Sequence, residues 1–119
     1  MRDIKKIVPI VSMQVEFCRV AVAKEIQIES GIRDQISALD RPHMSGDTSI
    51  GAAQSRTLWR IWVEQRRGEL NISLARTLAN RAAAEAKLSQ VLGREKVIKK
   101  LQKRANKERL CLLERRAAQ

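Results

Sequence analysis

The chain has 119 residues and a net charge of +11, with 44% apolar but only 3% aromatic residues. This length excludes a large multidomain enzyme, and one Phe, two Trp and no Tyr provide little bulky material for a compact globule or a half-buried sheet. Five Gly and two Pro are too few for a loop-rich all-β fold, and the regularly spaced aliphatic residues are unlike those of a disordered chain. The composition predicts an all-α, elongated protein.

The first residues raise the question of a signal peptide. Residues 4–15 are largely apolar, but Lys5, Lys6 and Pro9 interrupt them and no small-residue cleavage site follows, so we expect neither export nor a membrane span. Cys18 and Cys111 form no C-x-x-C pair and no metal spacing, which indicates isolated thiols in a reducing compartment. The expected location is the cytoplasm.

A first helix is predicted at about residues 9–40, with Pro9 in its first turn. Its seam positions recur at alternating four- and three-residue steps: Val11, Val15, Cys18, Val22, Glu25, Glu29, Ile32, Ile36 and Leu39. Because two of these are glutamates while Ile26 and Ile28 lie beside them, we expect the buried face to drift around the helix there.

A turn is predicted at residues 41–47, where Pro42 stops the first helix, Gly46 breaks regularity and Asp47 can cap the next helix. His43, the only histidine, falls in this turn with no other metal ligand near in sequence. We interpret it as a solvated turn residue.

A second, very long helix is predicted at about residues 48–118, which contain no proline. Eight uncharged residues repeat every seven positions: Val63, Leu70, Thr77, Ala84, Val91, Ile98, Ala105 and Leu112. An interleaved row is mixed: Arg67, Leu74, Arg81, Leu88, Glu95, Gln102 and Arg109. This repeat predicts a left-handed coiled coil. Another row of mostly small residues is expected to widen the face for a partner helix: Ile61, Ile72, Ala75, Ala79, Ala82 and Ala86.

Two helices joined by a short turn are expected to form one antiparallel hairpin over residues 1–119. A turn centred near Met44 places Cys18 opposite Leu70, and the last thirty or so residues of the second helix then overhang by roughly 45 Å. The seam glutamates are expected to pair across the hairpin with Arg66, Arg60 or Arg56. Truncation after Leu88 should therefore leave the hairpin folded.

The charge lies mainly on the overhang. Residues 88–119 contain ten Lys and Arg against three Asp and Glu, a net charge of +7, whereas residues 1–41 carry +1 and residues 42–87 carry +3. Such a surface suits an acidic protein collar or a polyanion. The candidate partner-binding residues are Val91, Arg94, Ile98, Lys99, Lys100, Lys103, Arg104, Ala105, Lys107, Arg109 and Leu112.

No catalytic constellation is found. The chain has no Gly-rich phosphate loop and no metalloprotease or nucleophile-elbow motif, so we expect no enzymatic activity, no metal and no cofactor. Trp59 and Trp62 lie close to the hairpin tip. We expect one ring to pack on the first helix and the other to be partly exposed for a protein contact.

Residues 49–65, SIGAAQSRTLWRIWVEQ, lead from a Gly-bearing tip into an aromatic-containing second helix, which reaches a basic end at residues 93–104, GREKVIKKLQKR. This arrangement resembles the FliJ/YscO stalk proteins of bacterial flagellar and type III secretion export machines. The resemblance implies a cytoplasmic chaperone-like coiled coil, peripheral at the inner-membrane export apparatus, whose basic helix enters the export ATPase ring and promotes its activity. It also implies that the hairpin contacts the export gate or export chaperones near Trp59, Trp62 and Val63.

The sequence thus predicts a non-enzymatic, monomeric stalk or adaptor for protein export. Two alternatives remain. One is a coiled coil that binds nucleic acid through the basic tail, although the tail lacks aromatics that stack on bases. The other is a homo-oligomeric structural coiled coil in which the seven-residue seam pairs with its own copies.

Overall fold

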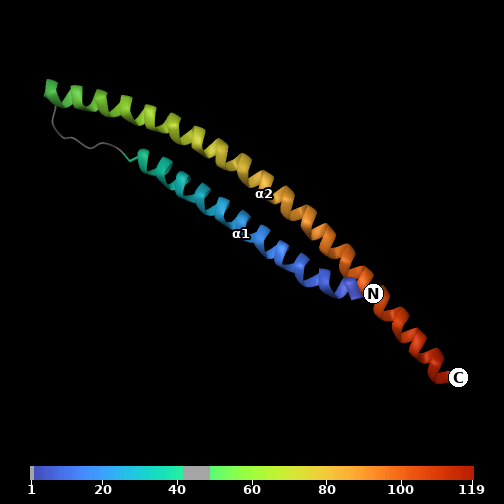
Figure 1. Ribbon diagram of the computed structural model, residues 1–119. Helices are drawn as coiled ribbons and strands as arrows, with labels where there is room; N and C mark the ends of the chain where they lie inside the picture. The colour runs from blue at the N-terminus through green and yellow to red at the C-terminus, as the bar shows by residue number, and fades with distance from the viewer. Residues whose placement is uncertain (1, 42–48) are drawn as a thin grey trace. The chain divides into compact units, whose positions relative to one another are not determined.

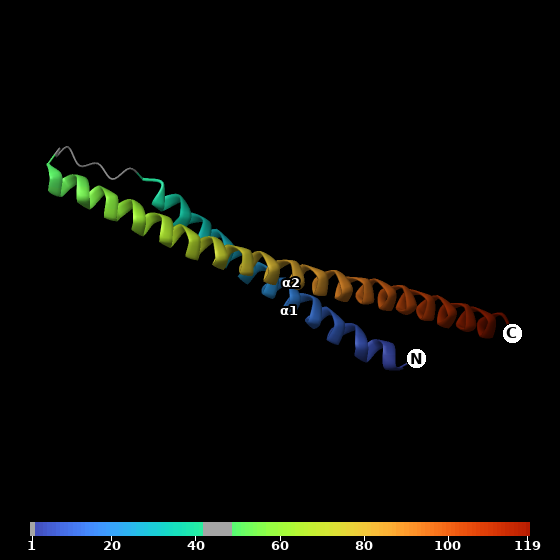
Figure 2. The same cartoon turned by 90° about the horizontal axis from the view of Figure 1, so that it is seen from above.

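The computed structural model describes residues 2–41 and 49–119. Over these residues it contains two helices and no strand, α1 (Arg2–Leu39) and α2 (Ile50–Ala118). The two helices run antiparallel as a hairpin, and the C-terminal end of α2 extends past the N-terminus of α1 (Figures 1 and 2). The predicted all-α class and the antiparallel hairpin with an overhanging C-terminal helix are confirmed.

The first helix begins earlier than the sequence predicted. It starts at Arg2 rather than at residue 9, so Pro9 lies inside α1 and not in its first turn. A proline at this point removes the backbone hydrogen bond to the carbonyl of Lys5. Ile4 and Val8 are half-buried, and the burial of their apolar side chains offsets the lost bond. The prediction was wrong because the apolar seam continues to the N-terminal side of the proline.

Ser49 caps the second helix. Its hydroxyl accepts a hydrogen bond from the Ala52 amide at 3.1 Å, and its carbonyl accepts one from the Ala53 amide at 3.0 Å. A serine in this position satisfies backbone donors that the first turn leaves unpaired. The helix accordingly begins at Ile50. The predicted cap, Asp47, and the predicted turn residues Pro42, His43, Met44 and Gly46 lie outside the described residues.

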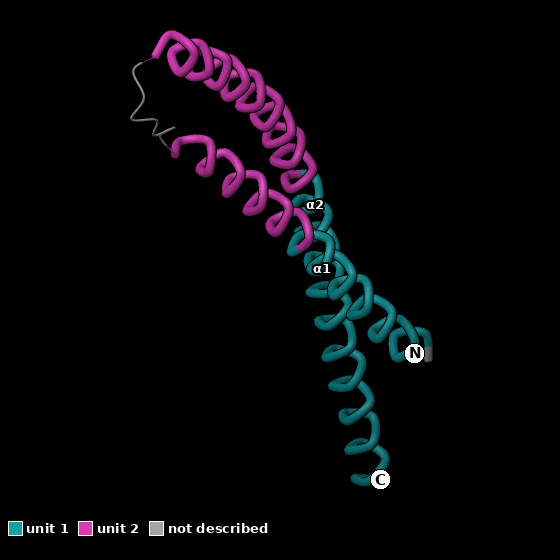
Figure 3. The backbone as a smooth tube through the Cα atoms, turned by 90° about the vertical axis from the view of Figure 1, so that its left-hand side faces the viewer, with its two compact units in different colours: residues 1–23, 83–119 teal, residues 24–82 magenta. Residues whose placement is uncertain are grey.

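The chain divides into two compact units (Figure 3). Unit 1 comprises residues 1–23 and 83–119, and unit 2 comprises residues 24–82. Each unit pairs a segment of α1 with a segment of α2, and each has its own buried side chains. The single hairpin expected from the sequence is therefore organised as two packing regions.

The core of unit 1 is a small cluster of Val15, Cys18 and Val91, against which Leu88 and Leu92 pack. These contacts place the α1 segment around Cys18 opposite the α2 segment around Leu88. The predicted register, with Cys18 opposite Leu70, was wrong. It assumed that both helices start together at the turn.

The correct register shortens the overhang. The heptad row and the interleaved row of α2 remain half-buried as far as Ala105 and Gln102, respectively. Every residue from 106 to 119 is exposed. The overhang is therefore these last residues and not the last thirty or so. Val91 is only 5% exposed, so truncation after Leu88 would cut through the core of unit 1 instead of leaving the hairpin intact.

Unit 2 buries Val63, Leu70 and Thr77 from α2 together with Glu29 from α1. The described seam follows the predicted heptads closely, since all nine predicted α1 positions are buried or half-buried. The expected drift of the buried face does not occur. Ile26 is 40% exposed while its neighbours in the seam remain covered. Ile28 is exposed as well.

The second apolar row of α2 is not covered by α1. All of its members are exposed: Ile61, Ile72, Ala75, Ala79, Ala82 and Ala86. If the two seam rows of α2 are the a and d positions of the heptad, the members of this row occupy the b and f positions. These positions face away from the partner helix. The expectation that these residues widen the buried face was wrong.

Candidate functional site

The basic residues of the C-terminal part of α2 are all exposed: Arg94, Lys96, Lys99, Lys100, Lys103, Arg104, Lys107, Arg109, Arg115 and Arg116. An ion pair with Glu95 holds Lys99 at 3.5 Å. The positive charges therefore face solvent around the helix, where an incoming partner meets them first.

The apolar residues among the predicted partner-binding residues are only partly accessible. Val91 is buried in the core of unit 1, while Ile98 and Ala105 are half-buried. Because its side chain packs within the chain, Val91 offers little exposed surface to a partner of the basic helix. Leu112 is 55% exposed and remains accessible to a partner.

The overhang contains four consecutive exposed apolar residues, Leu110, Cys111, Leu112 and Leu113. A shallow groove of about 520 Å³ crosses it, lined by Arg104, Lys107, Glu108, Cys111, Leu112 and Arg115. Apolar side chains edged by cations suit a protein surface that offers hydrophobic contacts and carboxylates.

Trp59 and Trp62 stack on each other, with ring centroids 5.1 Å apart and an angle of 27° between the planes. Trp59 is 36% exposed and lines a groove with Leu39 of α1, while Trp62 is 47% exposed. Val63 is 8% exposed and belongs to the seam. It is therefore not an exposed contact residue.

A groove of about 360 Å³ adjoins this pair in unit 2. Its lining combines apolar and charged side chains: Leu39, Arg41, Arg56, Trp59, Arg60, Val63 and Glu64. A stacked, half-exposed tryptophan pair beside cations is a suitable anchor for a partner protein, since Trp and Arg dominate the energetics of many interfaces.

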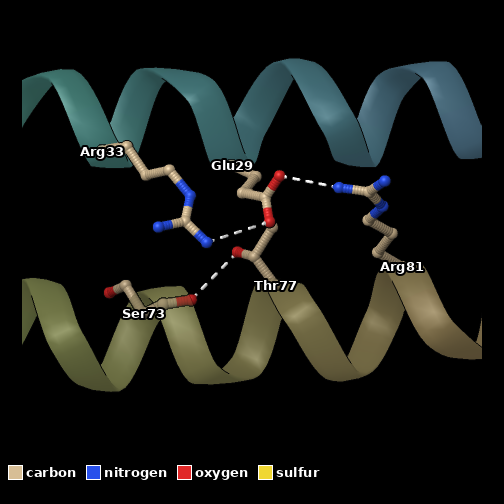
Figure 4. A network of polar contacts seen from close by, with 5 residues as sticks. All are labelled: Glu29, Arg33, Ser73, Thr77 and Arg81. Atoms are coloured by element: carbon tan, nitrogen blue, oxygen red, sulfur yellow. Dashed lines mark hydrogen bonds and ion pairs between the residues drawn. The ribbon is translucent and has the colours of Figure 1, made fainter.

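A polar layer interrupts the seam of unit 2 (Figure 4). Arg81 of α2 donates a hydrogen bond to Glu29 Oε2 at 2.8 Å, and Arg33 approaches Oε1 of the same carboxylate at 3.5 Å. Beside them, the Thr77 hydroxyl donates to the Ser73 carbonyl at 2.9 Å. The expected partners of Glu29 were Arg66, Arg60 or Arg56, and this expectation was wrong.

Sequence reasoning missed this pairing although a signal was present. Arg81 belongs to the same mixed seam row as Arg67, and Glu29 belongs to the seam of α1. A charge in one seam is best satisfied by an opposite charge in the facing seam. Arg67 of the same row pairs instead with the exposed Asp40, just beyond the end of α1, at 2.8 Å.

Sequence reasoning also missed a second apolar face on α1. In unit 1, Ile10, Met13, Phe17 and Val20 are all more than half exposed. The signal was their spacing of three, four and three residues, which places them on one side of a helix.

The described residues contain no group of three or more His, Cys, Asp or Glu side chains that could hold a metal ion. Cys18 is buried and Cys111 is exposed, and both are free thiols. Neither described helix has an apolar stretch long enough to cross a membrane.

The chain was compared with protein-family models, with curated proteins and with solved structures, and none of them matches it.

Proposed function

We propose that this chain is a non-enzymatic stalk or adaptor of a bacterial flagellar or type III protein-export apparatus. Its basic C-terminal helix inserts into the export ATPase ring and promotes ATPase activity. The tryptophan pair, Trp59 and Trp62, contacts the export gate or an export chaperone. The protein acts in the cytoplasm at the inner-membrane export apparatus.

The observation that carries the proposal is the free end of α2. Residues 106–119 are exposed on every side, and they combine cations with the exposed leucines of the overhang. A helix that extends beyond its own partner helix offers a whole cylinder of surface to a surrounding socket. Its positive charge favours a socket lined by carboxylates.

A nucleic-acid-binding coiled coil is the second candidate, and the ten exposed basic residues of α2 favour it. Interspersed Glu95, Glu108 and Glu114 give this segment a mixed charge, which suits a protein socket better than a uniform polyanion. A homo-oligomer that pairs through the seam has less support, because α1 already covers Val91 and Leu70 within the chain.

The decisive experiment compares the full chain with residues 1–105 in a turnover assay of the cognate export ATPase, with excess duplex DNA present. We expect the full chain to stimulate turnover and the truncated chain, whose seam is complete, to remain helical by circular dichroism without stimulating. Full stimulation by residues 1–105 would contradict the role of the overhang.

A charge reversal tests the same surface without deletion. Lys107→Glu with Arg109→Glu should reduce stimulation at least about tenfold if the socket is acidic. Lys5→Glu with Lys6→Glu removes the same charge from exposed sites on α1 and should leave stimulation unchanged. The nucleic-acid coiled coil would be favoured if the native chain did not stimulate the ATPase but bound DNA in a salt-sensitive way, and if Lys107→Glu with Arg109→Glu abolished that DNA binding.

A further inference from the structure

The outward side of α1 in unit 1 carries a continuous apolar row. Ile10, Met13, Phe17 and Val20 are 55%, 72%, 78% and 66% exposed. Single exposed apolar residues are common on protein surfaces, but a contiguous row of large ones marks an interaction surface. Within the described residues of unit 1, the seam of α1 faces α2 and this second row remains exposed.

The row borders a groove between the two helices of unit 1. The groove has a volume of about 490 Å³, and its lining comes from both helices: Ile10, Met13, Gln14, Phe17, Cys18, Lys87, Val91 and Arg94. Cys18 and Val91 form its floor, since both are buried. Met13 and Phe17 stand on one edge, and Lys87 and Arg94 stand on the other.

This geometry is that of a helix pair with an open site for a third helix. The row advances by three, four and three residues, the spacing at which side chains of two packed helices interdigitate. A partner helix can insert its own apolar side chains between Met13 and Phe17 and reach the floor. A flat lipid surface cannot reach a floor that lies between two helices.

Charge decides between a foreign helix and a second copy of the chain. The residues of unit 1 include fifteen Lys and Arg against six Asp and Glu, a net charge of +9. Two copies meeting at this face would bring two such units together, which like-charge repulsion opposes. Lys87 and Arg94 on the edge instead favour carboxylates on the incoming helix.

We propose that the unit 1 groove binds an amphipathic helix of a partner protein, whose apolar row is flanked by Glu or Asp. The apolar row of that helix packs on Ile10, Met13 and Phe17, and its carboxylates pair with Lys87 and Arg94. This surface is separate from the overhang, so the proposal does not depend on the export function.

The test uses the full chain and three synthetic helical peptides of about three heptads each. The first peptide has Leu at the a and d positions and Glu at the flanking positions. The second replaces those Glu residues with Lys, and the third has the composition of the first in a scrambled order. Binding is followed by fluorescence anisotropy of the labelled peptides. We expect the Glu-flanked peptide to bind at least about tenfold more tightly than either control.

Variants locate the binding. Phe17→Ser alters an exposed side chain, so circular dichroism and thermal unfolding should remain unchanged while affinity for the Glu-flanked peptide falls at least about tenfold. Ile72→Ser is the matched control, because Ile72 is similarly exposed but lies in unit 2, and it should bind as the native chain does.

The charge edge is tested by Lys87→Glu with Arg94→Glu, which should reverse the preference toward the Lys-flanked peptide. Lys100→Glu with Lys103→Glu lowers the net charge equally outside the groove and should preserve the original preference. The proposal would be overturned if the native chain bound the Glu-flanked and the Lys-flanked peptides equally well. It would also be overturned if the two double variants changed this preference to the same extent.

Two further outcomes would replace the proposed occupant. Binding of the native chain, but not of Phe17→Ser, to phosphatidylcholine vesicles containing about a quarter phosphatidylglycerol would assign the row to a membrane. A dimer in sedimentation analysis that Phe17→Ser dissociates would assign it to a second copy. The proposal requires that neither occurs. Residues 1–105 should bind the Glu-flanked peptide with the same affinity as the full chain does. The peptide result can therefore be interpreted even if the proposed export function is wrong.

Discussion

Glu29 shows how one charged side chain can occupy a buried seam. It is 8% exposed and is engaged by arginines from both helices. A carboxylate in this position is tolerated because hydrogen bonds to charged donors offset part of its desolvation. It also favours one alignment of the helices, since a slipped seam would leave the carboxylate facing an apolar row.

Removing one partner of this pair should therefore destabilise the protein. Glu29→Ala is expected to lower the free energy of unfolding by about 2 kcal/mol, because the charged hydrogen bond from Arg81 to this buried carboxylate is lost. Urea denaturation followed by circular dichroism measures the change. Glu16→Ala is the control, since Glu16 forms an exposed ion pair with Arg19 that should contribute less than about 1 kcal/mol. Equal losses would contradict a special role for the seam pair.

Gly68 provides the opposite case, a residue whose replacement should stabilise the chain. It lies inside α2 without a positive φ, and a Cβ added there meets nothing within 4 Å. Gly68→Ala should raise the free energy of unfolding by about 1 kcal/mol, because alanine loses less backbone entropy in a helix. Gly93→Ala, in an equally open site, should behave alike. A loss of stability in either variant would show that the position is crowded.

At the scale of the helices, the heptads predicted most of the fold. The alignment of the two helices, which was predicted from the position of the turn, was wrong. Both seam rows could be predicted from sequence because a helix covers its partner at three- and four-residue steps. The alignment of the two rows could not be predicted by counting from the middle of the turn. The end of α1 lies beside Arg67, which pairs with Asp40, whereas α2 already begins at Ile50.

The same scale explains which site residues were predictable. Exposure of the basic residues followed from their positions outside the seam rows. The stacking of Trp59 on Trp62 did not, because side-chain rotamers rather than helix periodicity decide whether two rings three residues apart meet. Burial of Val91 was implied by its place in the seam, but only the register showed that α1 reaches it.

The register has a direct test in the seam of unit 1. Val91→Ala should cost about 2 kcal/mol of unfolding free energy, because it removes buried methyl groups from the cluster with Val15 and Cys18. Val97→Ala makes the same change at a site that is 56% exposed and should cost less than about 0.5 kcal/mol. Chemical denaturation of both variants compares them, and similar values would mean that this α1 segment does not pack on Val91.

At the scale of the whole chain, charge is divided unequally between the two units. Unit 1 carries +9, whereas the residues of unit 2 include nine Lys and Arg against seven Asp and Glu. Both proposed binding surfaces that depend on positive charge, the overhang and the α1 groove, belong to unit 1. Raising the ionic strength should weaken both more than it weakens any contact made by the tryptophan pair.

Truncation separates the overhang from the packed part of the chain. Residues 1–105 should unfold with a midpoint close to that of the full chain, because residues 106–119 are exposed and contribute no core. Residues 1–88 lack Val91 and Ile98, so the N-terminal segment of α1 loses its packing partner. We expect thermal unfolding by circular dichroism to show a lower midpoint and reduced helicity for the shorter chain alone. Unchanged helicity in residues 1–88 would contradict the described core.

The different environments of the two thiols make the native chain its own spectroscopic reporter. Cys111 is exposed within the overhang while Cys18 is buried in the core of unit 1, so a maleimide dye or nitroxide attaches to the first and spares the second. The label then sits on the end of α2 without any engineered cysteine. Immobilisation of that label on addition of a partner would record entry of the helix into its socket in real time.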